Sequence, residues 1–392
     1  MTTVMTAKEN ARASVDEARG ALVDLSHRIH AKPETCFEEE KGCEWTAAAL
    51  DDANAGFKID MGVADLPTAF VATAGTGPLH IGICAEYDAL PGVGHACGHN
   101  VIAAAAVGAG IALARIADDI GITVSVLGTP AEEGGGGKIF MLERGAFDGI
   151  HASMMVHPAP FELDHMPCAA ASMLNIAYTG KTAHASAFPE LGINAADALT
   201  VAQVGIGLLR QHMRSDSRIH GIVTKGGDAP NIVPGDTTGE WIVRAPTLDR
   251  LSELEPRVRA CFEAGALATG AKLEITEKCP AYSEFADDID LMALYRRNAI
   301  ELGRKPLEDA SSFPPASTDM ANISLAMPAI HPLLGLGSFP AVNHQPEFTA
   351  FCATAVADQA AIDGAVGMAW TVIDAAADEA LSKRLRAAAP RG

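Results

Sequence analysis

The hydrophobic positions along the chain first follow a helical spacing and then break into short apolar runs. Helical patterns cover residues 7–31 and 38–53, and the runs that follow are "TAFVATA", "LHIGICA", "ITVSVLGT" and "HASMMVH". Each run is about five to eight residues long, which is the usual length of a buried strand in a parallel sheet. The alternation of such runs with helical segments predicts an α/β domain in which helices cover a mostly parallel sheet.

The pattern changes from about Met173 onward. The elements predicted there are, in order, a strand at 173–180, a helix at 194–213, strands at 219–227 and 237–246, a helix at 248–270 and a strand at 271–278. The order βαββαβ is that of a ferredoxin-like α+β module. We therefore expect an inserted domain at 172–284 within a discontinuous domain made of 1–171 and 285–392, to which both termini belong.

Composition narrows the classes of partner. The formal charge of −20 repels phosphate backbones and anionic lipid surfaces, so nucleic acid and membranes are not expected as partners. The longest apolar run, residues 101–117, is rich in Ala and Gly and is interrupted by Arg115, so a buried helix is expected there. No secretory signal is visible, and the eight scattered cysteines contain no CxxC pair, so we expect a cytoplasmic protein with reduced thiols.

Side chains able to bind metal collect where the predicted strands end. In an open parallel sheet, functional groups gather just beyond the carboxyl ends of the strands. Three strands bring polar groups to that edge, which in chain order are Glu86, Asp88, His95, Cys97, His99, Glu132, Glu133 and His157. This convergence points to a functional site more strongly than any one residue does.

Cys97 and His99 lie in "GHACGHN", where Gly94 and Gly98 allow a tight turn. Three interpretations of the C-x-H spacing remain open on the residues alone. It can belong to a metal site, to a thiol nucleophile with His95 or His99 as its base, or to a buried cysteine beside a histidine that caps a helix.

Glu132 and Glu133 lie in "TPAEEGGGGK", which resembles a phosphate-binding loop only in its glycines. Lys138 is followed by Ile139 rather than Ser or Thr, and two carboxylates repel phosphate, so a phosphate loop is rejected. A helix-capping turn is the simpler alternative. Adjacent carboxylates also suit a division of labour in which one binds a cation and the other acts as a general base.

Two histidines further along the chain complete a possible ligand set. His157 ends the run "HASMMVH", and His344 lies in "PAVNHQPEFT", a loop after an apolar segment. Each of them taken alone is more often a structural histidine. The full set, which suits two ions that share a bridging ligand, is Cys97, His99, Glu133, His157 and His344.

These residues resemble the co-catalytic metallopeptidases that include aminoacylases, auxin-conjugate hydrolases, p-aminobenzoyl-glutamate hydrolase and β-alanyl-lysine dipeptidase. The resemblance is closest to the dipeptidase and aminobenzoyl-glutamate branch. It runs through nearly the whole chain, in the motifs "EYDALPGVGHACGHN", "GTPAEEGGGGK", "VHP", "GKTAHASAFP", "GINAADAL", "GGDAPNIVPG", "VRAP", "STDMANIS" and "NHQPEFT".

The resemblance implies a two-metal active site in which Glu132 is the general base. The ligands that it implies are Cys97, His99, Glu133, His157 and His344, holding two divalent ions, with zinc expected and manganese or cobalt also acceptable. It further implies that the inserted domain is a lid that forms a homodimer contact. On that lid His184 would stabilise the oxyanion, while Asn231 and Arg244 would hold the substrate.

Several residues nearby receive weaker assignments. Asp88 is expected to orient a ligand, and Asp319 is a weaker candidate of the same kind. Asn100, also expected to support the ligands, stands where the auxin-conjugate branch has Asp, which indicates the dipeptidase-like branch. His95 receives no role.

The function predicted from the sequence is metal-dependent hydrolysis of an amide bond. The expected substrate is a small-molecule amide, either an N-acyl amino acid, a dipeptide or an aminobenzoyl-amino acid. One alternative is a metal-independent cysteine amidase that uses Cys97, and another is a catalytically silent small-molecule-binding protein on the same fold. A chelator distinguishes the first alternative, and a hydrolysis screen of metal-loaded protein distinguishes the second.

Overall fold

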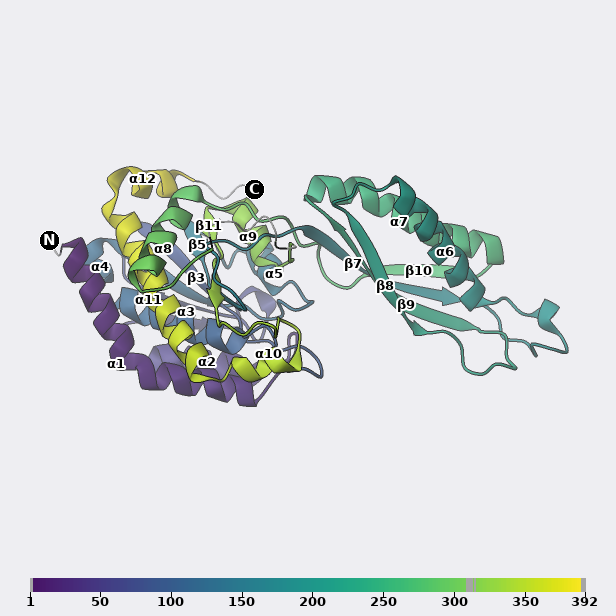
Figure 1. Ribbon diagram of the computed structural model, residues 1–392, viewed down its shortest axis with the longest axis horizontal. Coiled ribbons are helices and arrows are strands. Elements are labelled where there is room, and N and C mark those ends of the chain that lie inside the picture. The colour runs from purple at the N-terminus through teal and green to yellow at the C-terminus, as the bar shows by residue number, and fades with distance from the viewer. Residues whose placement is uncertain (1–2, 308–312, 314, 389–392) are drawn as a thin grey trace. The chain divides into compact units, whose positions relative to one another are not determined.

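The computed structural model describes residues 3–307, 313 and 315–388, and the chain forms two compact units (Figure 1). The first unit is Met1–Pro167 with Phe285–Gly392, and the second is Cys168–Glu284. The second boundary falls at the predicted position, and the first falls at 168 rather than 172. The difference arises because strand β7 begins at Ala170, where small residues ahead of the apolar run already pair with strand β9.

The first unit is built on a six-stranded sheet with the order β1-β2-β4-β3-β5-β11. The strands β3, β4, β5 and β11 are parallel to one another, and β1 and β2 join the edge beside β4 in antiparallel pairing. The bounds are β1(Lys58–Met61), β2(Phe70–Ala74), β3(Leu79–Ala85), β4(Ile122–Gly128), β5(Ala152–Met154) and β11(Ala329–Ile330). The mostly parallel sheet predicted from the apolar runs is therefore present.

The run "HASMMVH" does not form one strand, as predicted, but two. Its first part is β5 in the main sheet, and His157 begins β6(His157–Ala159), which pairs in parallel with β12(Leu333–Gly335) in a separate two-stranded sheet. The continuous burial of the run hides the break, because Met155 and Val156 between the two strands are also fully buried. His157 therefore begins a strand of its own rather than ending a strand of the main sheet.

Helices cover the sheet of the first unit. They are α1(Val4–Ala31), α2(Glu40–Asp52), α3(His99–Ala114), α4(Ala117–Ile120), α5(Gly137–Glu143), α8(Ile289–Glu301), α9(Met320–Ala326), α10(Pro346–Phe351), α11(Ala355–Ala377) and α12(Glu379–Ala387). Helix α3 packs against both α1 and α11 (Figure 1). Its Ala and Gly side chains allow this close approach, since a Cβ on Gly108 would lie 2.8 Å from Ala365 Cβ.

The expectation that residues 101–117 form a buried helix is met by α3, whose residues His99 to Leu113 are all buried. Within the described part of the chain, α11 is the one helix with the length and apolar composition of a membrane span, and 83% of its most apolar window is buried inside the protein. Burial of this kind is what a core helix shows.

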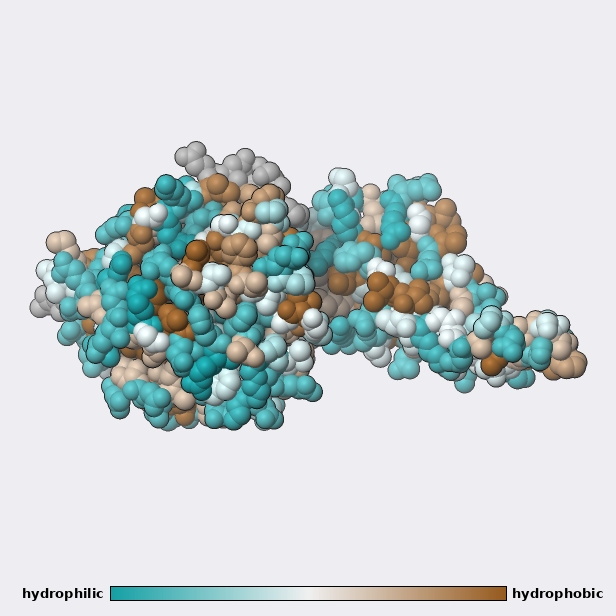
Figure 2. Space-filling view, turned by 60° about the horizontal axis from the view of Figure 1, so that its bottom comes forward, coloured by the Kyte–Doolittle hydropathy of each residue, from teal (hydrophilic) through white to brown (hydrophobic). Residues whose placement is uncertain are grey.

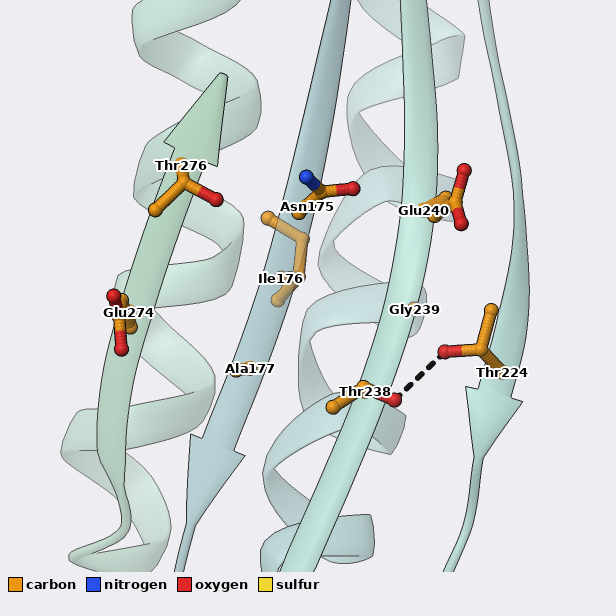
Figure 3. Close-up of a pocket in the computed structure, with 9 residues that line it drawn as sticks. All are labelled: Asn175, Ile176, Ala177, Thr224, Thr238, Gly239, Glu240, Glu274 and Thr276. Atoms are coloured by element: carbon orange, nitrogen blue, oxygen red, sulfur yellow. Dashed lines mark hydrogen bonds between the residues drawn. The ribbon is translucent and has the colours of Figure 1, made fainter. Parts of the chain in front are cut away.

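The second unit is a four-stranded antiparallel sheet with the order β10-β7-β9-β8. Its elements follow the predicted sequence β7(Ala170–Thr179), α6(Ala195–Leu209), β8(Arg218–Lys225), β9(Asp236–Ala245), α7(Leu248–Thr269) and β10(Lys272–Glu277). Helices α6 and α7 bury one face of the sheet around Tyr178, Trp241 and Phe262. The opposite face is polar, and Figure 3 shows Asn175, Thr238, Glu240, Glu274 and Thr276 along it.

Candidate metal centre

The candidate centre lies beyond the carboxyl ends of β3 and β4. These strands pair in parallel with Ala85 opposite Gly128, so the segments that follow them leave the sheet side by side. The first segment carries Glu86 and Asp88, and the second carries Glu132 and Glu133. The parallel register thus explains why residues more than 40 positions apart in the chain meet at one site.

His99 is held by Asp88. The imidazole is fully buried at the start of α3, and its Nδ1 lies 2.9 Å from Asp88 Oδ1. This bond leaves Nε2 directed at three carboxylates, with Glu86 Oε2 at 3.3 Å, Glu132 Oε2 at 3.8 Å and Glu133 Oε1 at 3.9 Å. Burial alone lowers the pKa of His99, but the charges of Asp88 and Glu86 together raise it well above its usual value.

Cys97 is buried in the turn before α3. Burial raises the pKa of its thiol, and the negative charge of Glu133 and Glu132 raises it further. Only the thiolate is an effective nucleophile, so this acidic surrounding disfavours the metal-independent cysteine amidase. A bound divalent cation supplies the positive charge that the thiolate needs.

His157 and His344 approach the centre from other segments. His157 Nδ1 lies 2.8 Å from the Pro158 carbonyl oxygen, which leaves Nε2 for a ligand, and its ring meets His99 edge-on at 5.8 Å between centroids. Burial and the nearby His99 lower the pKa of His157 to about 4, so it is a neutral donor. His344 is exposed at φ 70°, its N–H bonds to the Ala96 carbonyl, and its Nε2 lies 4.0 Å from Glu133 Oε2.

The five predicted ligands fall into two overlapping groups whose ligand atoms lie within 4.8 Å of one another. One group is Cys97, His99 and His157, and the other is Cys97, Glu133 and His344. His99 also belongs to a further group of the same kind with Glu86 and Glu132. The buried His99 Nε2 has no hydrogen-bond partner within the described structure. A sulfur, nitrogen and oxygen donor set with excess buried carboxylate and an unpaired imidazole nitrogen fits divalent cations.

A buried ion-pair network beneath the centre went unrecognised in the sequence. Lys138 is fully buried at the start of α5, and its Nζ lies 2.5 Å from Glu86 Oε1 and 2.7 Å from Asp319 Oδ1. The Lys138 N–H also donates to Asp319 Oδ2 at 2.9 Å. A lysine placed directly after a glycine run was the available signal, but Lys138 was weighed only as evidence against a phosphate loop.

The weaker assignments divide between those that touch the ligands and those that do not. Asp88 bonds His99, as predicted, whereas Asp319 bonds Lys138. Asn100 differs from its predicted place, since its Nδ2 donates to Ser26 Oγ and to the Cys352 carbonyl, both at 2.8 Å. It therefore joins α3 to α1 and to the chain after α10 rather than supporting a ligand.

Two buried histidines beside the centre stand apart from the ligand groups. His95, without a predicted role, has its ring 6.2 Å from that of His30, and burial lowers its pKa to about 3. His331, which no sequence pattern singled out, lies 5.6 Å from the His157 ring. Neither belongs to the groups of potential ligands found in the described residues.

The three predicted lid residues all lie in the second unit. His184 and Asn231 are on neighbouring segments, because His184 bridges to Ile232 and the Ala185 N–H donates to the Asn231 carbonyl at 3.0 Å. His184 Nδ1 accepts the Ala187 N–H at 3.2 Å. Arg244 is half-buried on β9, with its Nε 3.4 Å from His220 Nε2.

The fold and this centre define a metal-dependent amide hydrolase. The family model "Peptidase family M20/M25/M40" matches residues 82–361, and the chain belongs to this family. The mouse Xaa-Arg dipeptidase is 36% identical over 401 residues, which cover 97% of this chain and 91% of that protein.

Two further similarities extend this result. One polypeptide of the Escherichia coli p-aminobenzoyl-glutamate hydrolase is 33% identical over 292 residues, covering 69% of this chain and 60% of that protein. Among solved structures, the Bacillus subtilis YXEP protein, described as a dinuclear metal-binding peptidase, has a TM-score of 0.62 at 21% identity, covering 90% of this chain and 98% of that chain. The fold predicted from the sequence and the type of chemistry are therefore confirmed, and the silent binding protein is not favoured.

Proposed function

We propose that this protein hydrolyses the amide bond of small carboxylate-bearing substrates, dipeptides first, with N-acyl and aminobenzoyl amino acids as the related classes. The observation that carries the proposal is the pair of ligand groups sharing Cys97 directly beside Glu132. The similarity to Xaa-Arg dipeptidases over nearly the whole chain supports a dipeptide as the first choice.

The metal requirement follows from the donor set. We infer that Cys97, His99, Glu133, His157 and His344 hold two divalent ions, with Cys97 as the shared ligand because it belongs to both groups. Zinc is the expected ion, since a thiolate and imidazoles favour it, and manganese or cobalt would also be accepted. When bound, the ions lower the pKa of a water molecule and polarise the scissile carbonyl.

Glu132 then acts as the proton carrier. It is buried, and burial together with the charges of Glu86 and Glu133 raises its pKa well above the usual value, which suits a group that must take up a proton. Its carboxylate takes the proton from the attacking water and hands it to the leaving amine nitrogen. Glu133, next in the chain, is left to serve as a ligand.

His184 is proposed to stabilise the oxyanion. Because its Nδ1 accepts the backbone N–H of Ala187, and lies 3.4 Å from that of Ser186, the proton of the neutral ring is on Nε2. Nε2 is therefore a donor, which is what a developing negative charge requires. Asn231 on the neighbouring segment is proposed to hold the substrate, and Arg244 to bind its carboxylate through the planar guanidinium.

The proposed setting is a cytoplasmic homodimer. All eight cysteines are thiols rather than disulfides, which supports a reducing compartment. Strand β8 ends the sheet of the second unit, and Ile222 and Val223 on it are 63% and 46% exposed. An edge strand of this length with exposed apolar side chains is a surface for pairing with a second copy.

The test of the proposed function is Glu132→Gln, which keeps the size of the side chain and removes the base. The variant should lose roughly 10²–10⁴ of kcat on dipeptide substrates while retaining the bound metal of the wild type. Glu143→Gln, a change at an exposed glutamate on α5, is the matched control and should keep full activity. A near-normal rate in Glu132→Gln would overturn the assignment of the base.

The substrate class and the metal requirement are tested together. The wild type, stripped with a chelator and reloaded with zinc, manganese or cobalt, is assayed on dipeptides, N-acyl amino acids and p-aminobenzoyl-glutamate. Activity should vanish on stripping and return on reloading, with dipeptides as the best class. Activity that survives stripping would restore the cysteine amidase alternative.

A further inference from the structure

Glu39 is a fully buried carboxyl group that the proposed mechanism does not use. It lies at the N-cap position of α2 but makes no side-chain bond to cap that helix. Its side chain turns inward, where burial and the charge of Asp88 raise its pKa to about 7. A buried carboxyl group is costly unless its oxygens are fully bonded, so its partners show what it holds in place.

The partners of Glu39 come from three separate segments. Its Oε1 accepts the N–H of Phe37 and the N–H of Ala131, each at 2.9 Å. Its Oε2 accepts the hydroxyl of Thr68 at 3.1 Å. The Tyr87 hydroxyl in turn donates to the Thr68 carbonyl. One side chain thus connects the loop before α2, the segment before β2 and the loop after β4.

The Ala131 peptide is in a conformation that needs support. Ala131 has φ 61°, in the left-handed region that costs a residue with a Cβ about 1 kcal/mol. Its carbonyl accepts the N–H groups of Gly135 and Gly136, both at 2.9 Å, while its N–H is held by Glu39. The two loops leave no room for rearrangement, since a Cβ on Gly135 would lie 2.6 Å from both Ala131 Cβ and Phe37 Cε2.

The backbone on both sides of Glu132 is therefore fixed by a buried carboxylate. Glu39 holds the N–H of Ala131, and Asp88 Oδ2 accepts the N–H of Glu133 at 2.9 Å. Asp88 also bonds His99, so changing it disturbs the candidate ligands. The hydrogen bonds of the Glu39 side chain reach no candidate ligand, so its substitution tests loop position separately from metal binding.

We propose that Glu39 is a positioning residue, which holds the Ala131 peptide and thereby aims the Glu132 carboxylate at the water that it deprotonates. The inference rests on the proposed function, because it assigns the effect of Glu39 to the base. A displacement of about 1 Å in a reacting group is enough to cost roughly a hundredfold in rate.

The main test is Glu39→Met, which fills the same space without an acceptor. It should lower kcat by roughly ten- to a hundredfold, with KM and bound metal within about twofold of the wild type. Glu39→Gln retains an acceptor for the Ala131 N–H and should recover kcat to within about fivefold. The exposed neighbour Glu38 supplies the matched control, and Glu38→Ala should behave as the wild type.

A double variant separates positioning through Glu132 from general loosening of the fold. If Glu39 acts through the base, adding Glu39→Met to Glu132→Gln should lower kcat by less than about twofold further. A normal kcat in Glu39→Met with only a lower melting temperature, or a full further loss in the double variant, would overturn the inference.

The two proposals fail in different ways. A normal rate in Glu132→Gln overturns the base assignment and the role of Glu39 together, whereas a low rate there with normal kcat in Glu39→Met overturns the role of Glu39 alone. If Glu39→Met does not fold, Thr68→Val replaces it, because it removes the hydroxyl bonded to Oε2. That variant should lower kcat about two- to tenfold at unchanged KM, and unchanged kcat would count against the inference.

Discussion

Cys97 is the residue on which both ligand groups depend. Its thiol lies among Glu133, Glu132 and Asp88, and each of these negative charges opposes loss of the thiol proton. A divalent cation reverses that balance, because a coordinated thiol is deprotonated. The same surroundings that disable a free nucleophile therefore suit a metal ligand.

Replacing Cys97 with Ser should lower metal retention before it changes the fold. A hydroxyl is a far weaker ligand than a thiolate, so dialysed protein should hold about one ion or fewer per chain instead of about two. Since metal displaces the thiol proton, wild-type affinity should rise with pH, and the variant should release about one proton fewer per chain on zinc binding. Elemental analysis and titration calorimetry in buffers of different ionisation enthalpy measure both quantities.

The control for this prediction is Cys261→Ser on α7 of the second unit, where the thiol bonds only the Arg257 carbonyl among the described contacts. It should bind metal as the wild type does. Unchanged metal content and proton release in Cys97→Ser would show that the thiol is not a ligand.

At the residue scale, the sequence was informative where chemistry is carried by unusual neighbours. "CGH" and the doubled glutamate identify their own function class, and all five predicted ligands meet in the structure. Glu39 and Lys138 were missed because their partners are 92 and 181 residues away in the chain. Their roles depend on contacts that no local pattern encodes.

At the scale of elements, a buried charge network ties three segments of the first unit together. Arg304, just after α8, lies with Nε 2.8 Å from Glu162 Oε1 and Nη1 3.1 Å from Asp363 Oδ2 on α11. Its Nη2 also reaches the Gly335 carbonyl at the end of β12. The side chains of this network are 9–13% exposed, so an unpaired member stays largely desolvated.

Replacing Arg304 with Met should destabilise the first unit by about 3 kcal/mol, because Glu162 and Asp363 are left as uncompensated buried charges. Denaturant unfolding, followed by tryptophan fluorescence, measures the free energy. Arg12→Met is the control, because Arg12 is 40% exposed in its pair with Asp16 and should cost less than about 0.5 kcal/mol. Equal losses in the two variants would contradict this account.

Elements were predicted best where one segment carries its own signal. Strands β3 and β4 follow from their apolar runs, and α3 follows from its Ala-rich composition. The division of "HASMMVH" into β5 and β6 could not be predicted, because β6 exists through pairing with Leu333–Gly335 far along the chain. Strand partners at such separations are a property of the fold rather than of the segment.

At the scale of the whole molecule, the inserted unit adds surfaces that the first unit does not have. Its uncovered sheet face is polar, whereas Val201, Val204 and Leu208 form an exposed stripe on α6 at helical spacing. Figure 2 shows hydrophobic patches on this unit. The sequence could predict the insertion from the change in element order, but exposure of these side chains is visible only once the helix has a buried face.

The dimer proposed above makes a prediction about mass in solution. Edge strand β8 exposes Ile222 beside Val223, and a charge there both removes apolar contact and opposes strand pairing between copies. Ile222→Lys should shift the protein from dimer to monomer in sedimentation velocity at micromolar concentration. Ile300→Lys on α8 of the first unit changes a side chain of similar exposure, 54%, and should leave the dimer intact. A monomeric wild type, or equal dissociation of both variants, would exclude β8 as the contact.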